Sequence, residues 1–143
     1  MIYNANRELV KTLKAYTSII DVVYDAKRER YLQLLADGVI IIPSEIENTY
    51  LIYSNSDTSP SGNYLFFTDK NNYTGNKGLY DLIRIRKNEK LFSSSHYDLE
   101  FNNPISIINN LKSDDKEYLD VLKLVQQKRN KLFTTNKWQR YPD

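Results

Sequence analysis

Five short apolar segments, separated by polar and turn-forming stretches, run through the middle of this chain. They predict strands over residues 39–43, 49–54, 63–68, 79–86 and 91–101. The connections between them are short, which favours antiparallel strands that follow one another in a meander. This part of the chain constrains the fold most, because a sheet is required and the flanking segments have only the sheet to pack against.

The N-terminal segment has a different pattern. Apolar residues recur at helical spacing over residues 6–36, and the pair Asp37-Gly38 fits the end of a helix, with Gly38 in the left-handed conformation. A cluster of β-branched residues inside the segment favours a strand instead. The alternative is a hairpin in which residues 31–36 pair with residues 39–44 through a type I′ Asp-Gly turn. We favour the helix.

The C-terminal third predicts helices. Residues 104–112 are expected to form a short helix, and a longer one is expected to begin at Ser113 or Asp114, with Ser113 as its N-cap. We therefore predict one α+β domain over residues 1–133, with a basic and aromatic C-terminal tail over residues 134–143. The domain holds a mostly antiparallel sheet of about five strands, flanked by the N-terminal helix and one or two C-terminal helices.

Composition excludes several classes of site. The chain has no Cys and one His, so disulfides, thiolate metal sites, cysteine nucleophiles and paired catalytic His residues are ruled out. The chain begins without a signal-peptide pattern, and the apolar run Val39–Ile42 is too short to span a bilayer. We expect a cytoplasmic protein without a cofactor or a membrane partner. The many Asn, Lys, Tyr and Ile residues are typical of AT-rich coding sequence, as in low-GC bacteria, their phages and archaeal viruses.

The formal net charge is only +2, but residues 121–143 hold six cations against one acid. Cations contact phosphates, and aromatic rings stack on bases. The predicted binding residues are Arg84, Arg86, Lys128, Arg129, Lys131, Lys137, Trp138, Arg140 and Tyr141. We therefore predict a small non-enzymatic binding protein, of a phage or mobile-element type, that engages nucleic acid or a nucleic-acid-handling protein.

A second hypothesis is a small hydrolase or metal-dependent nuclease. In a strand over residues 91–101, the side chains of His96, Asp98 and Glu100 lie on one face, where they are suited to metal binding or to acid–base chemistry. A hairpin with a two-residue turn at Asn88-Glu89 places Asp81 opposite His96.

A third hypothesis is an inhibitor or immunity-type protein. It binds a protein target through the acidic region 37–76 and its Tyr-rich strands.

Overall fold

The structure, a computed structural model, describes residues 1–135 except residues 4, 14, 57–58 and 81. Its centre is a six-stranded antiparallel sheet in which each strand pairs with the next in the sequence, so the predicted meander is confirmed. The strands of this sheet are β3 (Ile19–Asp25), β4 (Arg30–Leu35), β5 (Ile40–Ile42), β6 (Thr49–Ser56), β7 (Ser59–Thr68) and β8 (Tyr73–Gly75).

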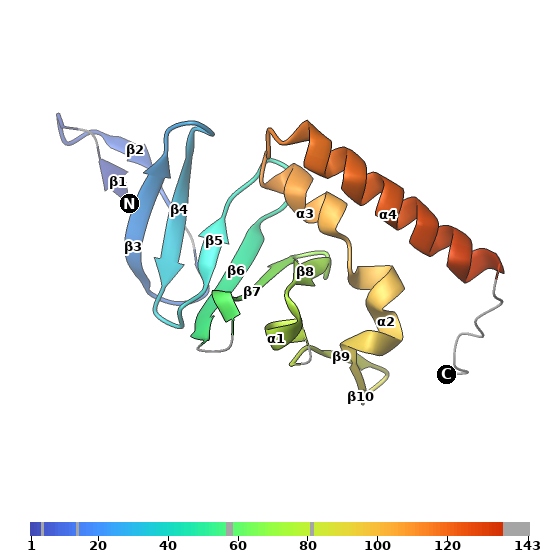
Figure 1. Ribbon diagram of the computed structural model, residues 1–143. Coiled ribbons are helices and arrows are strands. Elements are labelled where there is room, and N and C mark those ends of the chain that lie inside the picture. Colours follow the sequence, from blue (N-terminus) through green and yellow to red (C-terminus); the bar gives the residue numbers. More distant parts are fainter. Residues whose placement is uncertain (4, 14, 57–58, 81, 136–143) are drawn as a thin grey trace.

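Two short hairpins and the helices complete the α+β fold. The hairpin strands are β1 (Ile2–Tyr3) with β2 (Leu9–Lys11) and β9 (Arg84–Lys87) with β10 (Lys90–Ser93). The helices are α1 (Lys77–Tyr80), α2 (Ser94–Phe101), α3 (Pro104–Asn110) and α4 (Lys116–Thr135). Figure 1 shows the helices beside the sheet, with α4 on the outside of the molecule and the β9–β10 hairpin at one end.

The predicted N-terminal helix is wrong, because the segment forms β3 and β4 instead. Strands β4 and β5 pair through Asp37-Gly38, as in the hairpin alternative: Leu35 N donates to Val39 O at 2.9 Å, and Gly38 N donates to Leu35 O at 3.0 Å. Gly38 has the expected positive φ, 82°, but at a hairpin rather than at a helix end. Of the residues in this loop, only Gly38 has a positive φ, which indicates a type I turn followed by a bulge rather than a type I′ turn.

The strands predicted at residues 39–43, 49–54 and 63–68 are confirmed as β5, β6 and β7. The other two predictions hold only in part. Residues 77–80 form α1 before β9 begins, and residues 94–101 form α2 directly after β10. The predicted two-residue hairpin at Asn88-Glu89 is confirmed between β9 and β10, where φ is 48° and 64° at the two turn residues.

Both main C-terminal helices are present. The short helix α3 begins at Pro104 as predicted, whereas α4 begins at Lys116, later than Ser113 or Asp114. The N-cap of α4 is Asp115, whose carboxylate accepts a hydrogen bond from Tyr118 N at 2.9 Å. Ser113 lies before the helix, and its hydroxyl accepts a hydrogen bond from the backbone N–H of Asp115 at 3.3 Å. Asp115 therefore fills the capping position that the sequence analysis assigned to Ser113.

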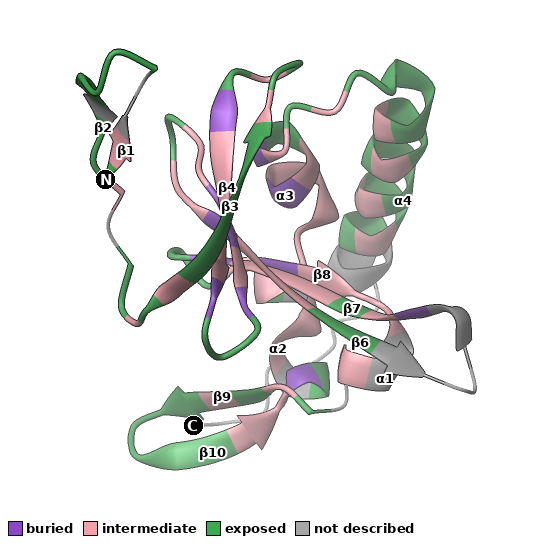
Figure 2. Ribbon diagram, turned by 90° about the vertical axis from the view of Figure 1, so that its left-hand side faces the viewer, coloured by how far each residue is buried: buried purple, intermediate pink, exposed green. Residues whose placement is uncertain are grey.

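The apolar core lies on the sheet and on α3. Leu35, Val39 and Ile41 form a buried cluster, with partly buried residues of β3, β6 and β7 packed against it. On α3, Ile107 is fully buried, and this helix lies against β7, β8 and α4. Figure 2 shows the buried residues concentrated in the sheet and α3, whereas α4 and the β9–β10 hairpin are largely exposed.

Arg30, at the start of β4, ties the sheet to the end of α3. Its guanidinium donates to the carbonyls of Asn110 at 3.3 Å and Leu111 at 3.0 Å, and to the Asp25 carboxylate at 3.3 Å. The last carbonyls of a helix have no partner within the helix, and the helix dipole favours a cation there. Arg30 therefore satisfies the end of α3 from a strand distant in sequence.

Candidate nucleic-acid interface

The β9–β10 hairpin has a dense positive charge, since the longer helix α4 spreads the same net charge over twice as many residues. Between Arg84 and Ser93 it holds four cations and one acid, which gives a net charge of +3. All four cations are exposed, and they are Arg84, Arg86, Lys87 and Lys90. The hairpin therefore presents a concentrated positive charge at one end of the molecule (Figure 1).

The register of the hairpin distributes these cations over both faces. Arg84 and Arg86 share one face because strand side chains alternate, and their cross-strand partners are Ser93 and Leu91. At the turn, Lys87 lies directly opposite Lys90. Like charges placed directly opposite destabilise a hairpin, so a bound polyanion would relieve this repulsion.

The other face of the hairpin packs on α2. Phe92 contacts the ring of Tyr97 edge-on, with the ring centroids 5.4 Å apart, and Lys87 Nζ lies 5.5 Å from the centre of the same ring. These contacts hold the hairpin by one face and leave Arg84 and Arg86 on the other. The cationic face is therefore positioned by packing rather than by loops.

A pocket of about 320 Å³ lies between this hairpin and the edge of the large sheet. Its walls include Phe67 and Tyr73 from the sheet, Phe101 from α2, and Arg84 and Arg86 from β9. The lining is therefore mostly apolar and aromatic, with the two arginines of β9 among its residues.

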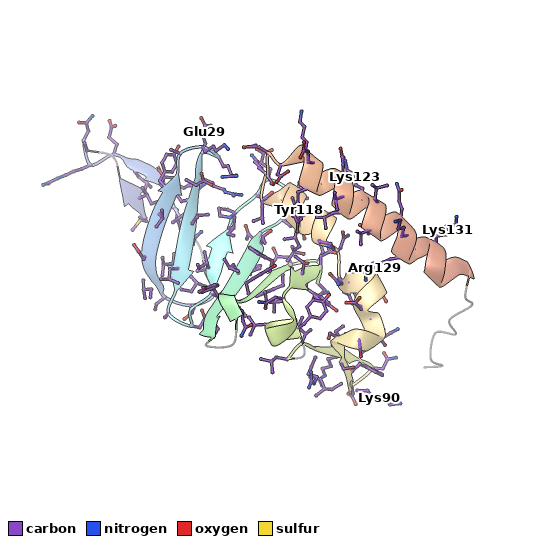
Figure 3. All side chains as sticks on the ribbon, in the orientation of Figure 1. Glu29, Lys90, Tyr118, Lys123, Arg129 and Lys131 are labelled. Carbon is purple, nitrogen blue, oxygen red and sulfur yellow. The ribbon has the colours of Figure 1, made fainter. Side chains whose placement is uncertain are left out.

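The predicted binding residues of α4 are in different environments. Lys128 and Lys131 are exposed. Arg129 instead points toward α2, where its Nη2 lies 2.7 Å from the Asp98 carboxylate (Figure 3). The side chains of Lys137, Trp138, Arg140 and Tyr141 lie outside the described residues.

Asp98 is the centre of a polar network that joins four elements. Besides Arg129 of α4, its carboxylate accepts from the Tyr80 hydroxyl of α1 at 2.7 Å and from the Asn102 amide at 2.9 Å. The Tyr73 hydroxyl of β8 donates to Ser94 O at 3.3 Å, and the rings of Tyr73 and Tyr80 are 5.1 Å apart. This network is a structural junction, in which every named group has a partner.

The two tyrosines of this junction have perturbed acidities. Burial, and then the negative charge of Asp98, raises the pKa of Tyr73 from its ordinary value of 10.0 to about 12. Burial and the hydrogen bond to Asp98 raise the pKa of Tyr80 still further. Both phenols therefore stay protonated in the folded protein at a pH where an unfolded chain loses the protons.

We expect the replacement Tyr73→Phe to reduce the loss of stability at alkaline pH. A raised folded-state pKa means that the stabilisation from Tyr73 is complete below pH 10.0 and is lost as the pH rises through about 12. Urea unfolding of both proteins at neutral pH and between those two values measures the difference. Equal alkaline losses in the two proteins would show that Tyr73 does not titrate in this way.

The structure does not place His96, Asp98 and Glu100 in a row, because these residues lie on a helix rather than on a strand. The backbone of this helix is also non-helical at Tyr97, where φ is −122° and ψ is 16°, so the alternating strand face that the hypothesis requires is absent. Asp81, the other expected neighbour of His96, lies outside the described residues. Among the described residues, no group of three or more His, Cys, Asp or Glu side chains could hold a metal ion.

Sequence reasoning missed Lys87 and Lys90 as parts of the cationic surface. The signal was present, since the predicted two-residue turn at Asn88-Glu89 already placed them opposite each other. It also missed the pairing of Asp98 with Arg129, which are 31 positions apart in the chain. No local pattern reports such a contact.

No helix in the described part of the chain is long and apolar enough to cross a membrane. Comparisons with protein-family models, with curated proteins and with solved structures found no match for this chain.

Proposed function

We propose that this protein is a non-enzymatic nucleic-acid-binding protein that contacts phosphates through the β9–β10 hairpin. The observation that supports this most is the exposed cluster of Arg84, Arg86, Lys87 and Lys90, in which two lysines face each other across the turn. A two-stranded ribbon fits the major groove of a duplex, and exposed cations contact the phosphates that flank it. The net charge of the whole chain, +2, limits this binding to a local surface.

Arg86 and Lys90 are the best residues with which to test the proposal. Neither forms an ion pair with any carboxylate that the structure describes. Each lies at the exposed end of the hairpin, so replacing either side chain removes little packing. A loss of binding in these variants then reports a lost phosphate contact rather than a damaged fold.

We expect Arg86→Gln to weaken binding to all sequences and to make binding less sensitive to salt. Each phosphate contact contributes about −0.9 to the slope of log affinity against log salt on a duplex, so the single variant loses about one unit of slope. The double variant Arg86→Gln/Lys90→Gln loses about two units. Titration of labelled duplex and single-stranded oligonucleotides at several salt concentrations measures both slopes.

Lys123→Gln is the matched control. This lysine is on the outer side of α4, far from Lys90 in Figure 3, and its side chain pairs with Asp120 at 3.0 Å. Its replacement removes one positive charge from the protein without touching the hairpin. Equal losses in the control and in Arg86→Gln would reduce the proposal to a general charge effect. Absence of binding at low salt would eliminate it and favour a protein target.

Lys128, Lys131 and the four predicted residues beyond position 135 remain a proposed second contact. They are proposed on the sequence pattern of cations interleaved with aromatic residues. Arg129 is not included, since its guanidinium is held by Asp98.

A further inference from the structure

Helix α4 has apolar side chains that its packing against the rest of the described protein does not bury. Its inner side includes the half-buried Leu119 and Leu122, and α4 packs directly on α3. A second group of apolar side chains is exposed by 47–58%. This group, called here the outer stripe, consists of Tyr118, Val121, Leu124 and Val125.

The outer stripe has the spacing of a helix-pairing seam. Tyr118, Val121 and Val125 are separated by three and four residues, which places them in line along one side of the helix, with Leu124 beside them. Figure 1 shows α4 on the outside of the molecule, so a partner can approach along its length. A helix of this length is about 30 Å long, which is enough for several turns of contact.

Opposite charges mark the two ends of the stripe. Glu117 lies at its N-terminal end, and Lys128 continues the spacing at its C-terminal end. Neither forms an ion pair with any residue that the structure describes. Glu117 and Lys128 lie six and five positions from Lys123, so they are almost equally distant from the middle of the stripe.

This arrangement is complementary to itself. When two α4 helices cross in opposite directions about a two-fold axis near Lys123, Glu117 of each copy lies beside Lys128 of the other, and the apolar residues meet between them. The helix dipoles are then also opposed. A parallel pairing instead places Glu117 against Glu117 and Lys128 against Lys128, which is repulsive. From these features we infer that the protein forms a homodimer through an antiparallel pairing of the α4 outer stripes.

The first test is a charge exchange. Glu117→Lys alone and Lys128→Glu alone each replace two attractive contacts of the dimer by repulsive ones, and we expect each to weaken self-association about tenfold. The double exchange restores opposite charges across the interface and is expected to restore association. Sedimentation equilibrium over a range of protein concentrations, without nucleic acid, measures the dissociation constants independently of the proposed function.

Lys123→Glu is the control for the exchange, because Lys123 is two residues from both Val121 and Val125, about 200° around the helix, so its side chain points away from the outer stripe and pairs with Asp120. It is expected to leave association unchanged. Val121→Asp is expected to abolish association while the circular dichroism spectrum stays that of the folded protein, because Val121 is 55% exposed. A wild-type protein that is monomeric at every concentration would overturn the inference, as would a double exchange that fails to restore association.

The second test fixes the direction of the helices. The chain has no Cys, so a single introduced Cys is the only thiol. In the antiparallel dimer, position 124 lies near the two-fold axis, whereas the two copies of position 118 are about 15 Å apart along the helices. A disulfide needs Cα atoms within about 7 Å. Leu124→Cys is therefore expected to crosslink with itself under mild oxidation, and Tyr118→Cys is not. The reverse result would exclude the antiparallel pairing.

Discussion

Replacement of Arg30 by Met is expected to lower the free energy of unfolding by about 3 kcal/mol, because it breaks a largely buried charge pair. The Arg30 side chain is 11% exposed, and its partner Asp25 is 17% exposed. Without the guanidinium, the Asp25 carboxylate keeps only Arg28, and the carbonyls of Asn110 and Leu111 lose their donor. Buried acceptors that lose a partner retain their full desolvation cost.

Arg28→Met provides the comparison. Arg28 also reaches the end of α3, where its Nε donates to Lys112 O at 3.2 Å, but its side chain is 28% exposed. Water replaces much of what this residue contributes, so we expect a loss of about 1 kcal/mol. Urea unfolding of the two variants measures the difference, and equal losses would contradict the assigned role of Arg30.

The second large effect is expected for Ile107→Ala. Ile107 is fully buried on α3, a helix that packs against β7, β8 and α4. Its truncation removes apolar contacts and leaves a cavity, which costs about 2–5 kcal/mol in comparable sites. Thermal and urea unfolding measure this loss.

Ile46→Ala is the control for Ile107→Ala, because the same chemical change is made at a residue that is 69% exposed. Exposed substitutions of this kind change stability by about 0.5 kcal/mol or less. If Ile107→Ala lowered stability as little as Ile46→Ala, α3 would not be a core element. The helix would then be joined to the sheet mainly through polar contacts.

The error at the N-terminus has a physical cause. Leu, Tyr and Ile side chains recur every three or four residues before Asp37, but the run from Ile19 to Val23 is almost entirely β-branched. Such residues lose rotamer freedom in a helix and pack well on a pleated surface. The pairing of β3 with β4, and of β4 with β5, then supplies contacts that a helix prediction from spacing alone does not include.

The error at α2 is of the opposite kind. Tyr97, Leu99 and Phe101 alternate as in a strand, but Tyr97 and Phe101 are also four residues apart, and their ring centroids lie 6.0 Å apart on the helix. A pattern this short fits both periods. The helix is stabilised by contacts of Asp98 with α1 and α4, which are invisible in the local sequence.

The candidate interface was predictable where it depends on neighbouring residues. The two-residue turn at Asn88-Glu89 fixes the register of β9 and β10, and this register places Arg84 and Arg86 on one face. The packing of the hairpin on Tyr97 and the ion pair between Arg129 and Asp98 were not predictable. Both depend on how α2 lies against elements that are distant in the sequence.

The anchor formed by Arg30 also sets an order of events during synthesis. Its carbonyl partners follow it by 80 and 81 positions, so the β3–β4 hairpin is made long before the end of α3 exists. At about 5–20 residues per second, this interval is roughly 4–16 s. During this interval the edge strand β3 is present in the nascent chain, but the end of α3 that anchors the hairpin is not. Ile20 and Val23 of this strand are exposed even in the finished fold. A ribosome that stalls within this window therefore holds an aggregation-prone hairpin, and release of the chain before residue 110 leaves Arg30 without both of its carbonyl partners.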